Sequence, residues 1–277
     1  MLKYFNSRMN EYYKDKVVVV TGGTDGIGRA LVDVLLRFGA KVATCGRNHD
    51  KLYALQAAHP SSFLHTLVAD VSAEADCQRF ISSTVEVFGG IDVLINNAGI
   101  SMRGLFKDLD VAVIKQLMDI NFYGAVYCTK LALPWLIQSK GSIVGISSIA
   151  GYRGLPGRTG YSSSKFALQG FLECLMTELR DDQVHVMWVS PGFTASGIRD
   201  NALNDKGEKQ KENPMDEGKM MTAAEVAIRI LKAVKNKKRT IVMTATGKET
   251  VFLNKFFPSL ADKLVHKFYF KNKELIK

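Results

Sequence analysis

The chain has 277 residues, 47% of them hydrophobic, which is enough to bury a substantial core in one large or two small domains. No stretch approaches the ~18 apolar residues of a membrane span, and residues 1–14 lack the apolar centre of a signal peptide, so we expect a soluble cytoplasmic protein. The formal net charge is +10, and most of it lies in residues 232–277, which contain twelve Lys and Arg but three Asp and Glu. The preceding chain is nearly neutral, which argues against a nucleic-acid-binding surface.

The first predicted strand is the β-branched run at residues 17–20, which is typical of a strand buried on both faces. A glycine-rich turn at residues 21–28 follows it directly, and an amphipathic helix is expected at residues 29–38. Strand, glycine turn and helix in this order form the setting that a dinucleotide-binding fingerprint requires, with the helix N-terminus facing the phosphates. Three glycines would allow the tight turn, the approach of the backbone to the pyrophosphate and the close packing of the helix, respectively: Gly22, Gly26 and Gly28.

A second strand at residues 41–45 ends where the adenosine ribose of such a cofactor would lie. An acidic residue there suits the free 2′-hydroxyl of NAD, whereas a basic residue suits the 2′-phosphate of NADP. The chain has Arg47 and no carboxylate before Asp50, so we predict NADP(H) as the cofactor. The alternative is that Arg47 is a solvated loop residue.

Four more strands alternate with helical patterns, and short polar motifs follow them. The strands are expected at residues 63–68, 91–95, 142–146 and 184–189; the motifs are Asp70-Val71, Asn96-Asn97-Ala98-Gly99, Ser147-Ser148 and Pro191-Gly192. No Pro/Gly/Ser-rich linker interrupts this alternation up to about residue 239, so we predict an α/β, doubly wound, mainly parallel sheet in a single domain, residues 1–250. The four cysteines, Cys45, Cys77, Cys128 and Cys174, lie far apart and suggest neither a disulfide framework nor a metal site.

Tyr161 and Lys165 are four positions apart and would share one face of a helix. An adjacent cation favours the phenolate, so we expect Lys165 to lower the pKa of Tyr161 and make it a usable proton donor to a carbonyl oxygen. The pair by itself more often marks an amphipathic helix surface. Two more polar residues, Asn121 and Ser148, favour a catalytic interpretation of this pair. Taken alone, Asn121 would be a surface amide of the helix predicted at residues 110–138, and Ser148 would be a turn hydroxyl that bonds its own backbone.

The ordered set of motifs from Lys16 to Ser196, with the spacing Thr-Gly-x-x-x-Gly-x-Gly, resembles the short-chain dehydrogenase/reductase family. The resemblance implies a Rossmann fold and hydride transfer between a nicotinamide and a carbonyl or secondary alcohol. Ser148 would donate a hydrogen bond to the substrate oxygen, Tyr161 would supply the proton, and Lys165 would stabilise the phenolate and bind the nicotinamide ribose. Asn121 would hold a water that connects Lys165 to solvent.

The resemblance also implies a set of cofactor contacts. Asp70 would contact the adenine; the alternative is that it is the N-cap of a helix beginning near Ser72. Asp25 counts against a 2′-phosphate, because some NADP-binding relatives carry a basic residue in this turn. Whether Thr194 or Ser196 contacts the nicotinamide amide stays open. The full set is Gly22, Thr24, Asp25, Gly26, Ile27, Gly28, Arg47, Asp70, Val71, Asn97, Tyr161, Lys165, Pro191, Gly192, Thr194 and Ser196.

Three segments are candidates for the substrate side: residues 101–104, 154–159 and 197–221. The last is long and charged, and is either a lid over the substrate or a disordered insertion. The apolar candidates Pro156, Phe193, Met220 and Met221 favour a lipophilic ketone or aldehyde. A homodimer or homotetramer is expected from the resemblance, through the helices that carry Asn121 and Tyr161.

Residues 251–277 form a predicted basic amphipathic extension, with apolar residues at helical spacing, three interspersed lysines and a new helix starting at Pro258. Such a helix suits either peripheral contact with a membrane or packing over the substrate side or a partner subunit. Rival functions for the whole chain are a non-catalytic NADP(H) sensor, a nucleic-acid-binding protein prompted by the basic run at residues 235–239, and an epimerase of the same fold. The intact Asn, Ser, Tyr and Lys set argues for a reductase.

Overall fold

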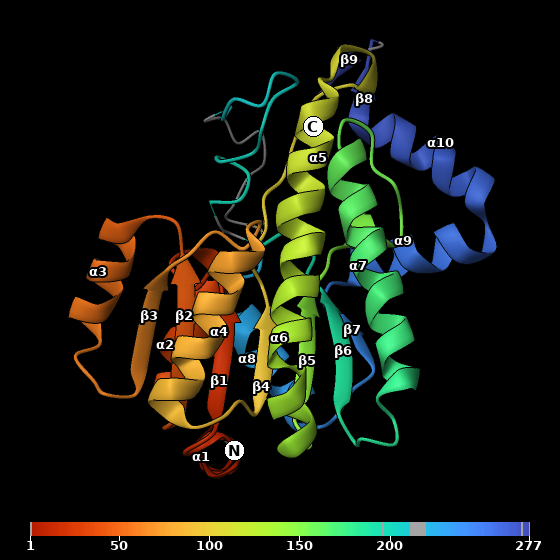
Figure 1. Cartoon of the computed structure of the whole chain (residues 1–277). Coiled ribbons are helices and arrows are strands. Elements are labelled where there is room, and N and C mark those ends of the chain that lie inside the picture. The colour runs from red at the N-terminus through yellow and green to blue at the C-terminus, as the bar shows by residue number, and fades with distance from the viewer. Residues whose placement is uncertain (1, 195–196, 211–219, 273, 277) are drawn as a thin grey trace.

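A computed structural model describes residues 2–194, 197–210, 220–272 and 274–276. Seven parallel strands form one sheet in the order β3-β2-β1-β4-β5-β6-β7 (Figure 1), which confirms the predicted doubly wound α/β fold. The strands are β1 (Val17–Thr21), β2 (Lys41–Gly46), β3 (Leu64–Val68), β4 (Val93–Asn96), β5 (Ser142–Ile146), β6 (His185–Ser190) and β7 (Thr240–Val242).

The central strands are buried on both faces, as their continuous apolar runs predict. All five residues of β1 are buried, and so are all those of β4 and β5. Val18 of β1 lies between Val42 of β2 and Val93 of β4, so the chain leaves β1 in one direction and later returns on its other side. This reversal opens a space beyond the carboxyl ends of β1 and β4, which is where parallel sheets bind ligands.

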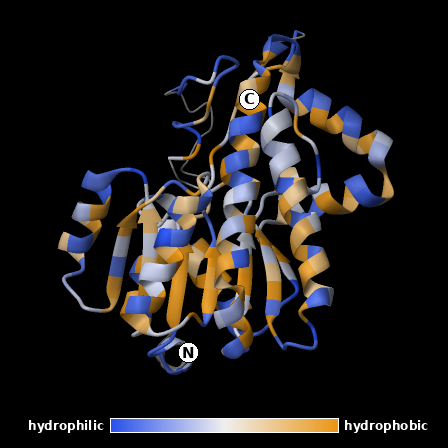
Figure 2. Cartoon of the chain, in the orientation of Figure 1, coloured by the Kyte–Doolittle hydropathy of each residue, from blue (hydrophilic) through white to orange (hydrophobic). Residues whose placement is uncertain are grey.

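Helices cover both faces of the sheet (Figure 1). One apolar cluster joins the sheet to α1, α2 and α8, and a second joins it to α4, α6 and α7 on the opposite face. Figure 2 shows the strands as the most hydrophobic layer of the protein. The helices up to the last strand are α1 (Leu2–Tyr13), α2 (Gly26–Arg37), α3 (His49–Ala58), α4 (Glu74–Phe88), α5 (Val111–Met118), α6 (Gly124–Gln138), α7 (Thr159–Glu178) and α8 (Ala223–Lys235), with short turns η1 (Phe106–Asp108), η2 (Asp119–Tyr123) and η3 (Ile149–Gly151).

Helix α1 was not predicted, because the sequence there mixes charged and aromatic residues without a clear apolar stripe. Met9 and Tyr13 nevertheless lie fully in the core, and the Tyr13 hydroxyl donates a hydrogen bond of 2.7 Å to the Leu231 carbonyl of α8. The long helix predicted at residues 110–138 is present but contains a wider π-type turn, η2, between α5 and α6. Such turns re-aim side chains and are frequent at functional sites.

The C-terminal extension consists of α9 (Ala245–Phe256), α10 (Pro258–Tyr269), β8 (Phe270–Lys271) and β9 (Glu274–Leu275). Pro258 occupies the first turn of α10, as predicted. The extension packs against the loop that follows β5: Arg153 forms an ion pair of 2.6 Å with Asp262, and Asn254 donates a hydrogen bond of 2.9 Å to the Tyr152 carbonyl. No helix among the described residues combines the length and the apolarity that a bilayer span requires.

Candidate active site

The glycine turn lies between the end of β1 and the start of α2. Gly22 has a φ of 70°, a conformation that side chains rarely adopt, so this position favours glycine. A Cβ on Gly28 would collide with the Gly22 carbonyl and the Asn97 amide, and Asn97 Nδ2 donates hydrogen bonds of 2.9 and 3.1 Å to the carbonyls of Thr21 and Gly22. Gly22, Gly26 and Gly28 thus let the backbone approach closely at the N-terminus of α2, which fits the pyrophosphate of a dinucleotide.

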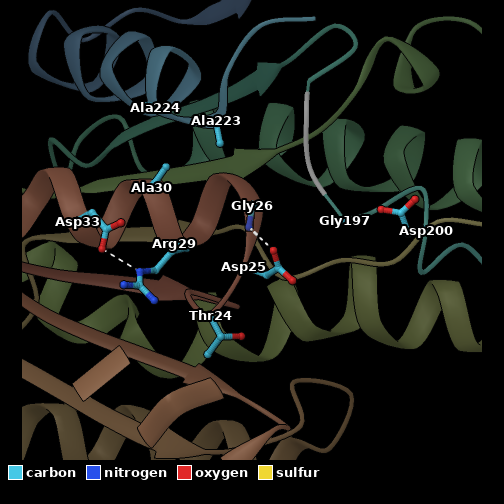
Figure 3. Close-up of a pocket in the computed structure, with 10 residues that line it drawn as sticks. All are labelled: Thr24, Asp25, Gly26, Arg29, Ala30, Asp33, Gly197, Asp200, Ala223 and Ala224. Carbon is cyan, nitrogen blue, oxygen red and sulfur yellow. Dashed lines mark hydrogen bonds and ion pairs between the residues drawn. The ribbon is translucent and has the colours of Figure 1, made fainter. Parts of the chain in front are cut away.

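A cavity of about 520 Å³ adjoins this turn, between the start of α2, the segment 197–200 and the start of α8 (Figure 3). Asp25 caps α2 by accepting a hydrogen bond of 2.7 Å from the Gly26 amide, and Arg29 pairs with Asp33 at 2.8 Å. Thr24, also in the lining, has its side chain against Gly46 at the end of β2. The predicted turn residues thus reach the ends of both β1 and β2.

Lys51 is a candidate that the sequence analysis missed. Its Nζ lies 2.6 Å from Oδ2 of Asp25, and this hydrogen bond lowers the pKa of the Asp25 carboxyl. The negative charge of Asp25, which counted against a phosphate, is therefore paired with a cation. The available signal was Asn48, a helix N-cap residue, which places Lys51 in the first turn of α3, shortly after the end of β2.

A second cavity, of about 280 Å³, lies where the adenosine end was expected, and its lining includes Arg47, Asp70, Ser72 and Ile120. Arg47 Nη1 lies 3.6 Å from Asp70 Oδ2, and more than half of the Arg47 side chain is exposed. The Asp70 carboxylate accepts hydrogen bonds from the backbone and hydroxyl of Ser72. Asp70 is not the N-cap of α4, because that helix begins at Glu74; the carboxylate instead forms a local turn. Val71 beside it is buried against Gly124.

Ser148, Tyr161 and Lys165 meet beyond the end of β5. Ser148 is the N-cap of η3, and its hydroxyl accepts a hydrogen bond of 3.2 Å from the Ala150 amide. Tyr161 and Lys165 share one face of α7, with Lys165 Nζ 5.7 Å from the centroid of the Tyr161 ring. The ammonium donates a hydrogen bond of 2.9 Å to the Ile146 carbonyl, so the last residue of β5 anchors it.

The expected effect of Lys165 on the Tyr161 phenol is wrong for the chain without its cofactor. Burial raises the pKa of Tyr161 above its ordinary value; the neighbouring Ser148 hydroxyl and the charges of Arg158 and Arg199 only partly oppose it. Burial also lowers the pKa of Lys165, which is 4% exposed, to about 8. The lysine ammonium is directed at the Ile146 carbonyl rather than at the phenol oxygen, and burial is the largest cause of both shifts.

Asn121 lies in the π-type turn η2 and is 1% exposed, so the helix-surface alternative is wrong. Its Oδ1 accepts a hydrogen bond of 2.8 Å from the Ile100 amide, while Nδ2 donates bonds of 2.9 Å to the Ile100 carbonyl and to Ser164. A Cβ on Gly99 would lie 3.1 Å from Asn121 Oδ1 and 3.4 Å from Lys165 Nζ. Asn121 and Lys165 therefore flank the same bare stretch of backbone.

Pro191 and Gly192 follow β6, as predicted, and Gly192 packs closely against Thr244 at the start of α9. The buried Thr194 hydroxyl donates a hydrogen bond of 3.2 Å to the Gly192 carbonyl. Ser196 lies outside the described residues. The choice between Thr194 and Ser196 therefore stays open.

The three segments expected on the substrate side come together. The Leu203 amide donates a hydrogen bond of 2.9 Å to the Ser101 carbonyl, and the Gly104 amide donates one of 2.9 Å to the Gly157 carbonyl. The described part of the predicted lid thus packs on residues 101–104; residues 211–219 lie outside the description. Met221 packs against the cluster around α2 and α8 rather than on the substrate side.

The sequence matches the family model described as short chain dehydrogenase over residues 16–207. It is 36% identical over 244 residues to mouse dehydrogenase/reductase SDR family member 7B, covering 86% of this chain and 76% of that protein. It is also 37% identical over 200 residues to 11-beta-hydroxysteroid dehydrogenase 1A of Arabidopsis thaliana, covering 70% of this chain and 56% of that protein. A short-chain dehydrogenase/reductase from Burkholderia phymatum, solved in complex with NAD, shares the fold with a TM-score of 0.78 at 24% identity, over 90% of this chain and 95% of that one.

Proposed function

Because this chain belongs to the short-chain dehydrogenase/reductase family, we propose that it is an NADP(H)-dependent reductase of lipophilic ketones or aldehydes. The family supports an oxidoreductase with a nicotinamide cofactor. The observation that carries the proposal is the meeting of Ser148, Tyr161 and Lys165 beyond the end of β5, with Asn121 and Lys165 flanking Gly99. All four side chains approach the carboxyl end of the sheet, where the glycine turn also lies.

The residues of the chain have separate tasks in this proposal. A bound nicotinamide supplies the hydride for reduction. The Ser148 hydroxyl donates a hydrogen bond to the substrate oxygen, where negative charge develops. Tyr161 donates its phenolic proton to the same oxygen; the phenol is protonated at neutral pH, as a proton donor requires, and burial raises its pKa further. Lys165 holds a positive charge beside the ring and would bind the nicotinamide ribose.

The preference for NADP(H) over NAD(H) rests on the charges between the last residue of β2 and the first turn of α3. Arg47 follows β2 directly, Lys51 lies in the first turn of α3, and no acidic residue occupies the end of β2. Two exposed cations near the expected adenosine ribose suit a 2′-phosphate, which carries up to two negative charges.

Replacing Arg47 with glutamate is expected to lower kcat/KM for NADPH by about 10- to 100-fold, because one phosphate contact is lost and a repulsive charge is gained. NADH, which lacks the phosphate, should be affected by no more than a few-fold. Initial rates with both cofactors measure the effect. The matched control is Arg79→Glu, since Arg79 lies on the exposed face of α4 and pairs with Asp76. Equal losses for NADPH and NADH in the Arg47 variant would contradict the assignment.

The proposed activity is tested by NADPH oxidation in the presence of a panel of lipophilic ketones and aldehydes, repeated with NADH. Turnover with NADPH supports the reductase. A chain that binds NADPH but oxidises it with none of the panel would instead favour the non-catalytic sensor, which needs the fold and the cofactor site but no proton donor.

A homodimer or homotetramer is also proposed. Of the apolar residues on α7, Leu168 and Leu172 are buried against the sheet, whereas Phe166 is exposed. Tyr123, at the end of η2, is exposed as well. These two rings support a contact through the α6 and α7 helices, and sedimentation velocity of the full chain would measure the number of subunits.

Peripheral membrane contact through the C-terminal extension is supported by one face of α9 and α10. Six apolar side chains are exposed there, and lysines lie among them. The face therefore combines apolar anchors with positive charge, as in helices that lie in the headgroup region of a bilayer. The apolar residues are Phe252, Phe256, Phe257, Leu260, Leu264 and Phe268; the lysines are Lys255, Lys263 and Lys267.

Substituting Phe256 and Phe257 with serine is expected to lower the fraction of protein that pellets with anionic phospholipid vesicles by about 10-fold or more, because each ring contributes 1–2 kcal/mol of transfer free energy. The control is Tyr53→Ser together with Phe106→Ser, two aromatics exposed elsewhere on the surface. Wild-type protein that stays in the supernatant would remove the membrane proposal.

A further inference from the structure

The three segments on the substrate side contribute one arginine each: Arg103, Arg158 and Arg199. Backbone hydrogen bonds join the segments, so the arginines are drawn together; the Arg103 amide donates to the Leu203 carbonyl at 2.8 Å. The charges of Arg103 and Arg199 act on the guanidinium of Arg158, and those of Arg158 and Arg199 act on the Tyr161 phenol. Three positively charged side chains are thus gathered around Tyr161, although the chain up to residue 231 is nearly neutral.

Arg158 lies directly beside the proposed proton donor. It is the N-cap of α7, three residues before Tyr161, and its charge acts on the Tyr161 phenol. Its Nη1 donates hydrogen bonds of 2.8 Å to Ser101 Oγ and 3.2 Å to the Met102 carbonyl. Tyr161 packs against the apolar cluster that contains Met102, so the guanidinium and the phenol border the same cluster.

The Arg158 charge has no acidic partner among the described residues. Its hydrogen-bond partners are the Ser101 hydroxyl and the Met102 carbonyl, both of which are uncharged. Asp205 packs on Gly104 nearby, yet no ion pair joins it to Arg103 or Arg158. Burial lowers the pKa of Arg158, which is the cost of holding a charge with little solvation. Charges in such places are normally paired.

The two remaining nitrogens of the guanidinium are available to a ligand. Neither Nε nor Nη2 of Arg158 donates to a described residue, and neither is among the fully buried groups that lack a partner. A purely structural arginine that ties residues 101–102 to α7 would need only Nη1. The edge of the guanidinium formed by Nε and Nη2 matches the two oxygens of a carboxylate or phosphate.

We propose, building on the reductase function above, that the substrate carries an anionic group, a carboxylate or phosphate, a few bonds from the carbonyl that is reduced, and that Arg158 binds this group with Arg103 beside it. The anion fixes the distance of the carbonyl from Tyr161. The substrate class is then an amphiphile, a lipophilic oxo compound with an acidic head, rather than a neutral ketone. Arg158 is a specificity residue, and Tyr161 remains the proton donor.

The test uses two matched pairs of probes with NADPH. One pair is 4-oxononanoic acid and its methyl ester; the other is 1-hydroxy-2-nonanone and its phosphate ester, which separates a carboxylate from a phosphate source. Wild type is expected to reduce at least one anion with a kcat/KM roughly 30-fold or more above that of its neutral partner. In Arg158→Leu this ratio should fall to near one. Wild type that reduces both neutral compounds at least as well as their anions would overturn the proposal.

The Arg103→Gln variant provides a second measurement that leaves the hydrogen bonds of Arg158 intact, and it should lower the same ratio by a smaller factor. Arg180→Gln is the control, since Arg180 is exposed at the end of α7, away from the three segments. Should none of the four probes be turned over, the reductase function is in doubt, but the inference is still decided by calorimetry with nonanoate and methyl nonanoate in the presence of NADP⁺. Tighter binding of nonanoate that disappears in Arg158→Leu supports it; equal binding of the two overturns it.

Discussion

Replacing Tyr161 with phenylalanine is expected to lower the rate of carbonyl reduction by about 100- to 10,000-fold, the range that a positioned acid contributes. The substitution removes one oxygen and leaves the ring packed against Met102 and its neighbours, so the fold and the cofactor site should be preserved. NADPH binding, followed by the change in its fluorescence, should stay within a few-fold of wild type. Turnover is measured with the best substrate found.

The control for this prediction is Tyr53→Phe, which removes the same oxygen from an exposed tyrosine on α3 and should leave turnover unchanged. A Tyr161→Phe enzyme with near-normal turnover would show that the proton comes from another group. The pH dependence offers an independent check. Since burial raises the pKa of Tyr161, reduction should hold its rate through neutral pH, while oxidation of the alcohol, which needs the deprotonated phenol, should rise with pH.

Replacing Lys165 with methionine is expected to have opposite effects on activity and stability. Activity should fall by at least about 100-fold, because the charge beside the phenol and the ribose contact are both lost. Stability of the cofactor-free protein at pH 7 should rise. Burial lowers the pKa of Lys165 from 10.5 to about 8, which corresponds to a penalty of about 3 kcal/mol for the charged form. After the lost hydrogen bond to Ile146 is subtracted, the net gain should be roughly 1–2 kcal/mol.

The pH dependence of this gain has a definite sign. Below pH 8 the lysine is charged in both the folded and the unfolded chain, so the folded wild type bears the whole penalty. Between pH 8 and 10.5 the unfolded chain binds the additional proton, so the wild type gains stability as the pH rises and the advantage of Lys165→Met shrinks. Urea unfolding of both proteins at pH 7, 8.5 and 10 would measure it. A Lys165→Met protein less stable than wild type at pH 7 would mean that the hydrogen bond outweighs the burial of the charge.

Much of the fold was predictable because its signals are local. A β-branched run such as residues 17–20 is typical of a buried strand, and this prediction is confirmed. The glycine-rich turn after it is also present, but it is shorter than predicted, because α2 begins at Gly26 and not at Arg29. Helix α1 escaped prediction, since its burial depends on contact with α8, more than 200 residues further on. The π-type turn at Asn121 was missed for a similar reason: one extra residue in a helical turn leaves the apolar pattern almost unaltered.

The candidate site likewise has features that the sequence predicts and features that only the structure reveals. The sequence by itself determined the family, the doubly wound parallel sheet and the residue types proposed to do the chemistry, because these depend on motifs whose spacing is set by strand and helix geometry. Only the tertiary structure decided the electrostatics. The pKa of Tyr161 is raised rather than lowered, Lys51 pairs with Asp25, and Arg158 stands beside Tyr161 with two other arginines near it. Charge interactions and desolvation depend on distance and burial in three dimensions, and residues far apart in sequence supply them, so no local pattern records their balance.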